Sequence, residues 1–349
     1  MESDLFLALF TLLEYHIKIF ELQSDKIVVL ESNSTEDKNM GAWLSKNFIE
    51  IANQSFDNGL ITHIGYKDVT CELLDKIVND PKIRVIQISK ELPDEAFSVI
   101  DSILEKKNDL IFRIYGLYGL KHFDISFLKQ MKHLHHLIIN CHLRNAPDLI
   151  DFNVLKELNL KSLSLDAFDL YDYSFINELS KDIEQITINA DAMKNSVKFD
   201  CQWLLQYKNL HTLWLGKKAK KNLECLSQIK TLKSLSLRGI KLSSFEFLKV
   251  MNLEKFELLW NSNSDLNELK DLKSLKQIGL WRINKLENID FISKLENLEV
   301  IKLQDLKHLK DLPDLSKLIH LKSIVLDNTG ICIDELDESI KSITERYWR

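Results

Sequence analysis

The chain has 349 residues, of which 45% are hydrophobic and 28% charged, and its formal net charge is −6 at pH 7. High apolar content without polar low-complexity tracts excludes a disordered protein. With only 9 glycines and 4 prolines, and no GxGxxG or GxxxxGK motif, the sequence also lacks the glycine loops that bind nucleotide phosphates.

Charge and leucine are unevenly distributed along the chain. Residues 1–60 carry ten acidic and four basic side chains, whereas residues 61–349 carry 42 of each. A neutral main body argues against a nucleic-acid-binding protein. Leucine occurs 60 times, and 48 of these lie in residues 101–349, so the second part of the chain has its own architecture.

Residues 1–58 are predicted to form an N-terminal capping region. IKIFEL (17–22) and IVVLES (27–32) flank QSDK like the arms of a hairpin, and GAWLSKNFIEIANQ (41–54) has the pattern of a helix. The first apolar run follows Glu2 and Asp4 and lacks a small-residue cleavage site, which argues against a signal peptide. No window approaches the ~20 apolar residues of a membrane span. We therefore expect a cytoplasmic protein without a membrane partner.

One phrase recurs from residue 61 onward: an apolar residue, two variable residues, then apolar, variable, apolar. Clear copies are LHHLII (134–139), LKSLSL (160–165), IEQITI (183–188), LHTLWL (210–215), LKSLSL (232–237), LEKFEL (253–258), LKQIGL (275–280), LEVIKL (298–303) and LKSIVL (321–326). Weaker copies are ITHIGY (61–66), IRVIQI (83–88) and LIFRIY (110–115). The clear copies follow one another at steps of 21 to 27 residues.

This spacing lies in the 20–29-residue range of leucine-rich repeats, and residues 59–330 resemble that superfamily. Because the phrase alternates with period two, its leucines point to one face of a short strand and the variable residues to the other. We therefore predict an α/β fold, a leucine-rich repeat solenoid of about 10–12 repeats. Its curved parallel β-sheet forms the concave face, and the stacked leucines form the core.

The segments that return between strands change character along the chain. Residues 93–109 place Phe97, Ile100, Ile103 and Leu104 on one stripe, which predicts a helix on the convex side of the early repeats. Later returns space their apolar residues by three, which favours 3₁₀ geometry and short turns. Residues 331–349 have helical apolar spacing and are predicted to form a C-terminal capping helix.

The late repeats are similar to the 22-residue subclass of internalin-type and phosphatase-regulating proteins. That resemblance implies an asparagine five positions after the fourth residue of each phrase. Only Asn261 matches; the other equivalent positions hold different residues. The asparagine ladder is degraded, so the function of one subclass does not transfer to this chain.

Candidate metal and catalytic residues are few. His133, His135, His136 and His142 are close in sequence, but they lack a set of carboxylate or thiol ligands at metal-binding spacing beyond Cys141. The five scattered cysteines suggest neither zinc nor a disulfide framework. We therefore expect neither a metal nor a cofactor, and no enzymatic activity.

The variable residues of the strands supply the candidate binding site. The residues singled out for a partner-binding patch are Trp214, Arg238, Lys255, Glu257, Trp260, Gly279, Trp281 and Arg282. Alternation predicts that Trp214 and Trp281 are exposed on the concave face, and Gly279 is expected to open room beside Trp281. For Trp260, at the start of a turn, exposure and core packing both stay open. Exposed Trp and Arg together are typical of hot spots in protein interfaces.

The favoured hypothesis is a monomeric, cytoplasmic and non-enzymatic module that recognises a protein partner through its concave face. An inhibitory or immunity-type role and a bacterial source are further suggestions. Two alternatives stay open: a small enzymatic or regulatory module in residues 1–60 with the repeats as a targeting arm, and carbohydrate or lipid recognition by the tryptophan patch.

Overall fold

The structure is a computed structural model that describes residues 48–57, 62–117 and 119–346. The described helices and strands all belong to the unit Ala42–Arg349. This unit contains one 15-stranded sheet with the order β15-β14-β13-β12-β11-β10-β9-β8-β7-β6-β5-β4-β1-β3-β2. Every neighbouring pair is parallel except β2 and β3.

The strands follow the repeated phrase. They are β1 (Phe48–Ala52), β2 (Phe56–Asp57), β3 (Thr62–Gly65), β4 (Val85–Ile88), β5 (Ile111–Gly116), β6 (His136–His142), β7 (Ser162–Phe168), β8 (Gln185–Ala190), β9 (Thr212–Lys217), β10 (Ser234–Arg238), β11 (Lys255–Leu259), β12 (Gln277–Trp281), β13 (Val300–Gln304), β14 (Ser323–Asp327) and β15 (Thr344–Arg346). All twelve copies of the phrase, the weaker ones included, contribute the strands β3 to β14.

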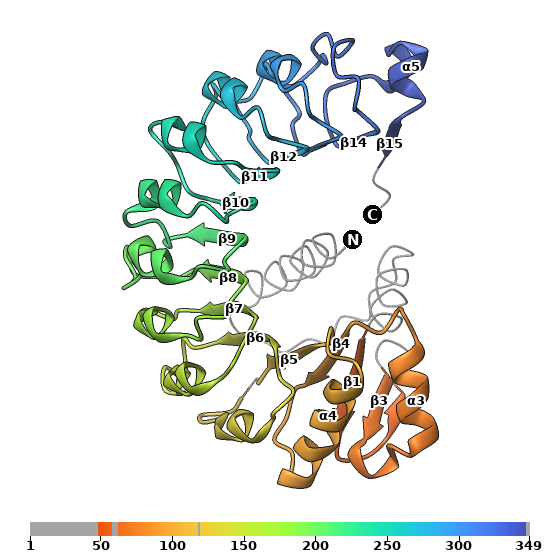
Figure 1. The fold of residues 1–349 in the computed structure, drawn as a ribbon, viewed down its shortest axis with the longest axis vertical. Helices are drawn as coiled ribbons and strands as arrows, with labels where there is room; N and C mark the ends of the chain where they lie inside the picture. Colours follow the sequence, from red (N-terminus) through yellow and green to blue (C-terminus); the bar gives the residue numbers. More distant parts are fainter. Residues whose placement is uncertain (1–47, 58–61, 118, 347–349) are drawn as a thin grey trace. The chain divides into compact units, whose positions relative to one another are not determined.

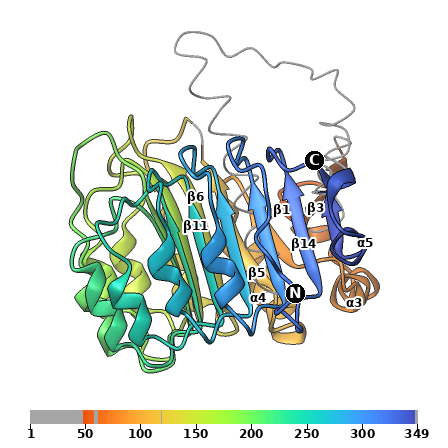
Figure 2. The same cartoon turned by 90° about the horizontal axis from the view of Figure 1, so that it is seen from above.

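The returns between strands contain two α-helices in the early repeats and mainly 3₁₀ turns in the later ones. The α-helices are α3 (Cys71–Asn79) and α4 (Asp94–Lys106). The 3₁₀ turns are η1 (Tyr66–Asp68), η2 (Ser126–Gln130), η3 (Phe152–Glu157), η4 (Ser174–Glu178), η5 (Cys201–Gln206), η6 (Leu223–Gln228), η7 (Glu246–Val250), η8 (Asn267–Asp271) and η9 (Asp290–Lys294). In this unit the strands form the inner, concave side of the solenoid, and the return segments form its outer side (Figures 1 and 2). The predicted change from helices to 3₁₀ turns is confirmed.

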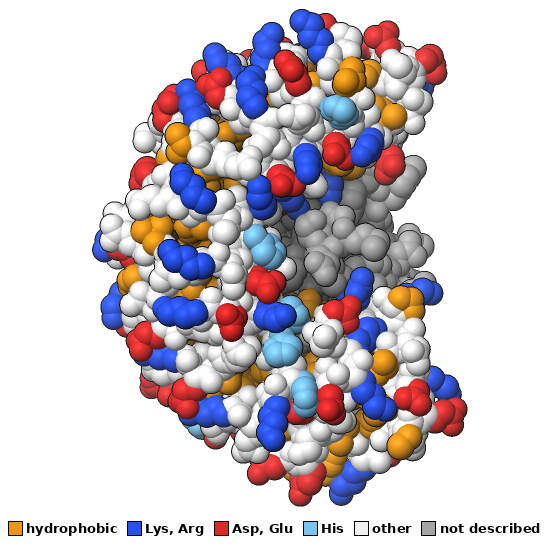
Figure 3. All heavy atoms as spheres, in the orientation of Figure 1, with side chains coloured by type: hydrophobic (Ala, Val, Ile, Leu, Met, Phe, Trp, Pro, Cys, Tyr) orange, Lys and Arg blue, Asp and Glu red, His pale blue; other side chains and the backbone are white. Residues whose placement is uncertain are grey.

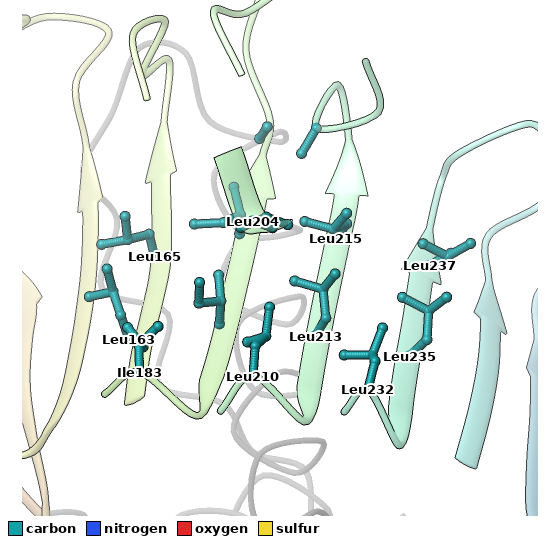
Figure 4. Close-up of a cluster of buried hydrophobic side chains, with 14 of the residues drawn as sticks. Leu163, Leu165, Ile183, Leu204, Leu210, Leu213, Leu215, Leu232, Leu235 and Leu237 are labelled. Atoms are coloured by element: carbon teal, nitrogen blue, oxygen red, sulfur yellow. The ribbon is translucent and has the colours of Figure 1, made fainter. Parts of the chain in front are cut away.

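The leucines of consecutive repeats are stacked in register and form the core. Leu213 pairs with Leu235 and Leu215 with Leu237 between β9 and β10, and all four side chains are at most 1% exposed. Figure 4 shows these layers together with Leu204 and Leu210 from the return segments. The chain therefore folds as a leucine-rich repeat solenoid, as the repeat spacing predicts.

The amino-terminal end differs from the prediction. The predicted helix at 41–54 is wrong for residues 48–52, because Phe48–Ala52 is the strand β1 and lies between β4 and β3. Ile49 and Ile51 alternate into the core while Glu50 faces the opposite side, which is the period of a strand. The predicted hairpin at 17–32 lies outside the described residues.

The carboxyl-terminal end also differs. In place of one helix there are a 3₁₀ turn η10 (Ile333–Glu335), one helical turn α5 (Glu338–Lys341) and the strand β15. The strand forms because the edge of β14 offers unpaired backbone groups, which a helix cannot satisfy. The amide of Ile324 accordingly donates to the carbonyl of Ile343 at 2.8 Å.

Gly330 connects this cap to the last full repeat at a point of close backbone approach. A Cβ atom at Gly330 would lie 2.7 Å from the carbonyl oxygen of Leu309 and 2.8 Å from that of Lys307. We expect Gly330→Ala to lower the free energy of unfolding by about 1–3 kcal/mol, because backbone atoms must move. Urea unfolding tests this, with Gly279→Ala as control, since there the 3.0 Å neighbour is a side-chain atom, Cγ of Glu257, and not the backbone. Equal losses in both variants would contradict the expectation.

Short polar side chains stabilise the turns that lead into the outer segments. In each case the side chain accepts a hydrogen bond from the backbone amide two residues later. The residues are Asp124, Asp151, Asp172, Asp200, Ser244, Asp265, Asn288 and Asp314. These Asx-type turns explain how the chain bends once per repeat with so few glycines. Asn261, the single match to the asparagine ladder, donates from Nδ2 to the carbonyl of Ile240 at 2.7 Å.

These aspartates make stability depend on pH. Hydrogen bonds from the backbone and side chain of Ser126 lower the pKa of Asp124, and the corresponding bonds from Asn153 and Ser316 lower the pKa of Asp151 and Asp314. A lowered folded-state pKa stabilises the fold above the unfolded value of about 3.9, and this contribution is lost as the pH falls through the folded pKa.

We therefore expect the Tm to fall as the pH decreases from about 5 to 3. The triple variant Asp124→Asn, Asp151→Asn, Asp314→Asn keeps an acceptor at each turn but has no carboxylate to protonate. Its Tm at pH 7 should stay close to that of the wild type, and its loss of Tm in acid should be smaller. An unchanged acid slope in the variant would show that these turns do not carry the effect.

Candidate functional site: the Trp–Arg cluster of the concave face

Side chains that alternate with the core leucines form a continuous face across the strands. Strand register aligns Arg238 with Leu259, Trp281 and Gln304 on β10 to β13. A second column aligns Ser236, Glu257, Gly279 and Lys302. The residue that follows each strand lies at the end of the first column, so neighbouring repeats bring their terminal side chains together.

Five side chains meet at this edge and form a group that we call the Trp–Arg cluster: Arg238, Trp260, Trp281, Arg282 and Asp305. The guanidinium carbons of Arg238 and Arg282 lie 4.4 and 4.7 Å from the ring centroid of Trp260. Trp260 and Trp281 pack edge to face, with centroids 6.4 Å apart and an interplanar angle of 88°. Both contacts are at distances where cation–π and aromatic pairs are attractive.

Asp305 is the acceptor that holds the cluster together. Its Oδ2 accepts hydrogen bonds from Trp281 Nε1 at 2.8 Å and from Arg282 Nε at 2.9 Å, and its Oδ1 accepts one from Asn328 Nδ2 at 2.6 Å. Although burial acts to raise its pKa, bonds from Asn328, Trp281 and Arg282 together lower the pKa of Asp305 below its usual range. The carboxylate therefore stays ionised at neutral pH.

The backbone of the cluster adopts the left-handed conformation once per repeat. The residues with positive φ at the end of β9 and directly after β10 to β14 are Lys217, Gly239, Trp260, Arg282, Asp305 and Asn328. Trp260 and Arg282 both have φ of 52°, a conformation that costs bulky residues about 1–2 kcal/mol each. Hydrogen bonds from Trp260 N to Trp281 O at 2.7 Å and from Arg282 N to Gln304 O at 3.0 Å hold it. Such strain is concentrated at functional sites in proteins.

The predicted exposure of Trp214 and Trp281 is wrong. Both side chains leave the strand on the side opposite to the leucines, yet they are only 7% and 9% exposed. The ring of Trp214 folds over Gly216, where a Cβ atom would lie 2.7 Å from the ring, and Trp281 is held by Asp305. Alternation fixes the face on which a side chain begins, but a large ring can lie flat along that face. For Trp260 the sequence leaves both exposure and core packing open, and the structure shows a half-buried side chain.

Lys255, Glu257 and Gly279 form a separate group beside the cluster. Lys255 Nζ lies 3.0 Å from Glu257 Oε1, and Ser236 donates a hydrogen bond to Glu257 Oε2 at 2.7 Å. The room at Gly279 is occupied by Glu257, whose Cγ lies 3.0 Å from the position of an added Cβ atom. The expectation that Gly279 opens space beside Trp281 is therefore wrong. Trp214 lies on β9, next to β10, and its ring folds over Gly216, the register partner of Arg238.

Asp305 is the member of the cluster that is not among the residues singled out from the sequence. It occupies the same repeat position as Trp260 and Arg282, at steps of 22 and 23 residues. This position follows the strand and lies beyond its two variable residues. Asp305 can be identified in the sequence when the residues that directly follow each strand are aligned from repeat to repeat.

Two further buried polar groups lie on the concave side of the amino-terminal repeats. Glu50 accepts hydrogen bonds from Gln87 Nε2 at 2.9 Å and from Ser89. Asn189 Nδ2 donates to Asp166 Oδ1 at 2.8 Å, and burial raises the pKa of Asp166. Neither group could be predicted from the sequence, because isolated polar residues in strands carry no motif.

The histidines are dispersed among different partners. His133 Nδ1 lies 3.1 Å from Asp101, and His136 Nδ1 lies 2.8 Å from the hydroxyl of Ser162. Within residues 48–57, 62–117 and 119–346, no group of three His, Cys, Asp or Glu side chains could hold a metal ion. The five cysteines are free. Over the same ranges, none of the helices has the length and apolar content to cross a bilayer.

Charged residues at the opposite end of the strands form ion pairs between repeats. Lys276 Nζ lies 2.8 Å from Glu254 Oε2, and Lys322 Nζ lies 2.6 Å from Glu299 Oε2. Acidic and basic side chains are interspersed on the face shown in Figure 3. Pairs of this exposed kind typically contribute at most about 1 kcal/mol, so they add little to the stability of the stacked repeats.

No protein-family model matches the chain, and no curated protein matches it. Among solved structures it is similar to three internalins of Listeria monocytogenes. Internalin C2 shares 18% identity over 58% of this chain and 87% of that chain, with a TM-score of 0.41. Internalin InlF shares 16% over 71% and 73%, with a TM-score of 0.31. The functional domain of InlJ shares 14% over 71% of this chain and 53% of its own length, with a TM-score of 0.41.

Proposed function

We propose that the chain is a non-enzymatic recognition module that binds a protein partner through its concave face. The observation that supports this proposal is the Trp–Arg cluster, in which two arginines and two tryptophans from consecutive repeats share one edge of the sheet. Tryptophan and arginine are the residues most enriched in interface hot spots. Keeping them at strained backbone positions costs stability, which a role in binding explains.

Site-specific photo-crosslinking tests this proposal. A photoreactive phenylalanine analogue replaces Gln304, which lies beside Trp281 on the concave face. The control replaces Lys129 in η2, an exposed residue of the outer side. We expect protein adducts at position 304 and not at position 129 after irradiation in cells that express the chain. Adducts at 129 alone, or at neither position, would contradict concave-face recognition.

An inhibitory or immunity-type role is one form that such recognition can take. It requires that the purified chain reduce the activity of the crosslinked partner at an equimolar ratio. We also propose a monomer in the cytoplasm, which five free cysteines support, since disulfides are rare in reducing compartments. The elution volume of the purified chain on size exclusion tests the monomer.

The alternative of carbohydrate or lipid recognition is less favoured. Those ligands commonly bind flat aromatic surfaces open to solvent, whereas Trp214 and Trp281 are buried. Glycan arrays and liposome sedimentation test this alternative directly. A regulatory module in residues 1–60 involves mainly residues outside the described ranges, and deleting residues 1–40 tests whether partner binding depends on them.

A further inference from the structure

The Trp–Arg cluster has more hydrogen-bond donors than acceptors. Asp305 receives bonds from Trp281, Arg282 and Asn328. The indole nitrogen of Trp260 is buried and has no hydrogen-bond partner in the described part of the chain. A buried donor without an acceptor costs about 1–3 kcal/mol, so this N–H group is a place where a ligand acceptor would be stabilised.

Arg282 adds further donors at the same place. Of its guanidinium nitrogens only Nε is bonded, to Asp305, among the described residues. Its side chain is 30% exposed, so its remaining N–H groups can be reached. Because the Arg282 guanidinium lies 4.7 Å from the Trp260 ring centroid, one planar group with two acceptor oxygens can contact both side chains.

The charge of the cluster limits the class of ligand. Asp305 Oδ2 lies 2.9 Å from Arg282 Nε and places one negative charge at the point of binding. A dianion such as phosphate would be repelled by Asp305 more strongly than a group with one negative charge. Guanidinium forks also match the planar geometry of a carboxylate.

Backbone conformation gives an independent reason to assign a role to these two side chains. Gly239, Asp305 and Asn328 occupy the left-handed position in neighbouring repeats, and these residue types tolerate positive φ. Lys217, Trp260 and Arg282 occupy the same position at a cost in backbone stability, and the last two carry the donors of the cluster.

We propose that the Trp–Arg cluster binds the carboxylate of an aspartate or glutamate side chain on the protein partner. One carboxylate oxygen accepts the hydrogen bond of Trp260 Nε1, and the other accepts from a terminal nitrogen of Arg282. This inference rests on the recognition function proposed above, since it names the group that the concave face recognises.

Indole ¹⁵N–¹H NMR of the full chain tests the inference, because it observes each tryptophan N–H directly. The probe is the peptide acetyl-Asp-Glu-Asp-Glu-amide, and the matched neutral control is acetyl-Asn-Gln-Asn-Gln-amide. The variant Trp260→Phe keeps an aromatic ring and identifies the Trp260 signal by its loss. We expect the acidic peptide to shift that signal saturably and the neutral peptide to leave it unchanged.

Variants at two arginines refine the test. Arg282→Gln should weaken binding of the acidic peptide about tenfold or more, as expected for loss of a charged hydrogen bond. Arg144→Gln, at an exposed arginine outside the cluster, should bind as the wild type does. The Tm of each variant is measured to verify folding, and an Arg282→Gln variant that does not fold is replaced by Arg282→Lys, which keeps the charge but not the planar fork.

Several outcomes would overturn the inference. An equal response to both peptides, an unchanged Trp260 signal, or a larger shift with inorganic phosphate than with the acidic peptide each excludes carboxylate recognition. If crosslinking at position 304 succeeds while Trp260 stays silent, this inference fails and the recognition function stands. If the peptide shifts Trp260 but no protein is crosslinked, the recognition function fails.

Discussion

Asp305→Ala is expected to lower the free energy of unfolding by about 3 kcal/mol, because it leaves the buried indole N–H of Trp281 and two partly buried donors without their acceptor. Three donors lose their acceptor at once, since Asp305 bonds Trp281, Arg282 and Asn328. Alanine also tolerates the observed φ of 50° less well than aspartate does. Chemical denaturation followed by tryptophan fluorescence measures the change.

The matched control for this prediction is Asp305→Asn. Asparagine tolerates the left-handed conformation and keeps one acceptor oxygen, so it should recover part of the stability that alanine loses. If the two variants are destabilised equally, the negative charge is decisive and hydrogen bonding is not. If Asp305→Ala is as stable as the wild type, the role assigned to Asp305 is wrong.

Trp214→Ala is expected to lower the free energy of unfolding by about 3 kcal/mol, at the low end for truncation of a buried aromatic ring. The ring covers Gly216, and the register partners of Trp214 on the neighbouring strands are Thr187 and Ser236. Its removal exposes backbone and leaves a gap of indole size. Thermal unfolding measures the loss.

Two comparisons make the Trp214 prediction specific. Gly216→Ala introduces a Cβ atom 2.7 Å from the Trp214 ring and should destabilise the wild type. In the Trp214→Ala background one of two obstacles is gone, since Asn189 Oδ1 also lies 2.7 Å from the added Cβ atom. Gly216→Ala should therefore cost less there than in the wild type, and a double-mutant cycle detects this coupling. Additive losses would show that the ring does not lie over Gly216. An unchanged Tm in Trp214→Ala would restore the sequence-based expectation of an exposed ring.

The solenoid could be predicted from the sequence because its signal is repeated. Each strand phrase is weak alone, but copies at steps of 21 to 27 residues define parallel strands, a common core and the face of every variable residue. The helix over 93–109 is predictable for a similar reason, since Phe97, Ile100 and Leu104 form one stripe and α4 (Asp94–Lys106) buries it.

The ends of the array could not be predicted in this way, because they do not repeat. FIEIA at 48–52 has strand alternation, but only the presence of β4 and β3 on both sides decides that it enters the sheet. Likewise Ile333, Leu336, Ile340 and Ile343 have helical spacing. The open edge of β14 nevertheless pairs with Thr344–Arg346, which form a strand. Local propensity is overruled by tertiary pairing at both places.

The candidate site could be predicted in part. Four of the eight residues named from the sequence, Arg238, Trp260, Trp281 and Arg282, lie in one cluster. Their burial could not be predicted, because alternation gives the face of a side chain and says nothing of its rotamer. The hydrogen bonds to Asp305 depend on its position as the left-handed residue after a strand. The sequence reveals this position only when the residues after successive strands are aligned.

The place of β1 between β4 and β3 limits how this protein can change in length during evolution. From β5 onward each strand has its sequence neighbours as its spatial neighbours, so duplication or loss of one repeat unit would leave every interface intact. At the amino-terminal end, β3 lies outside β1 although it follows β1 in the chain. Removing β3 would uncover β1, and inserting a repeat between them would separate paired strands. Length variation is therefore expected among the later repeats, while the first three parallel strands remain one indivisible unit.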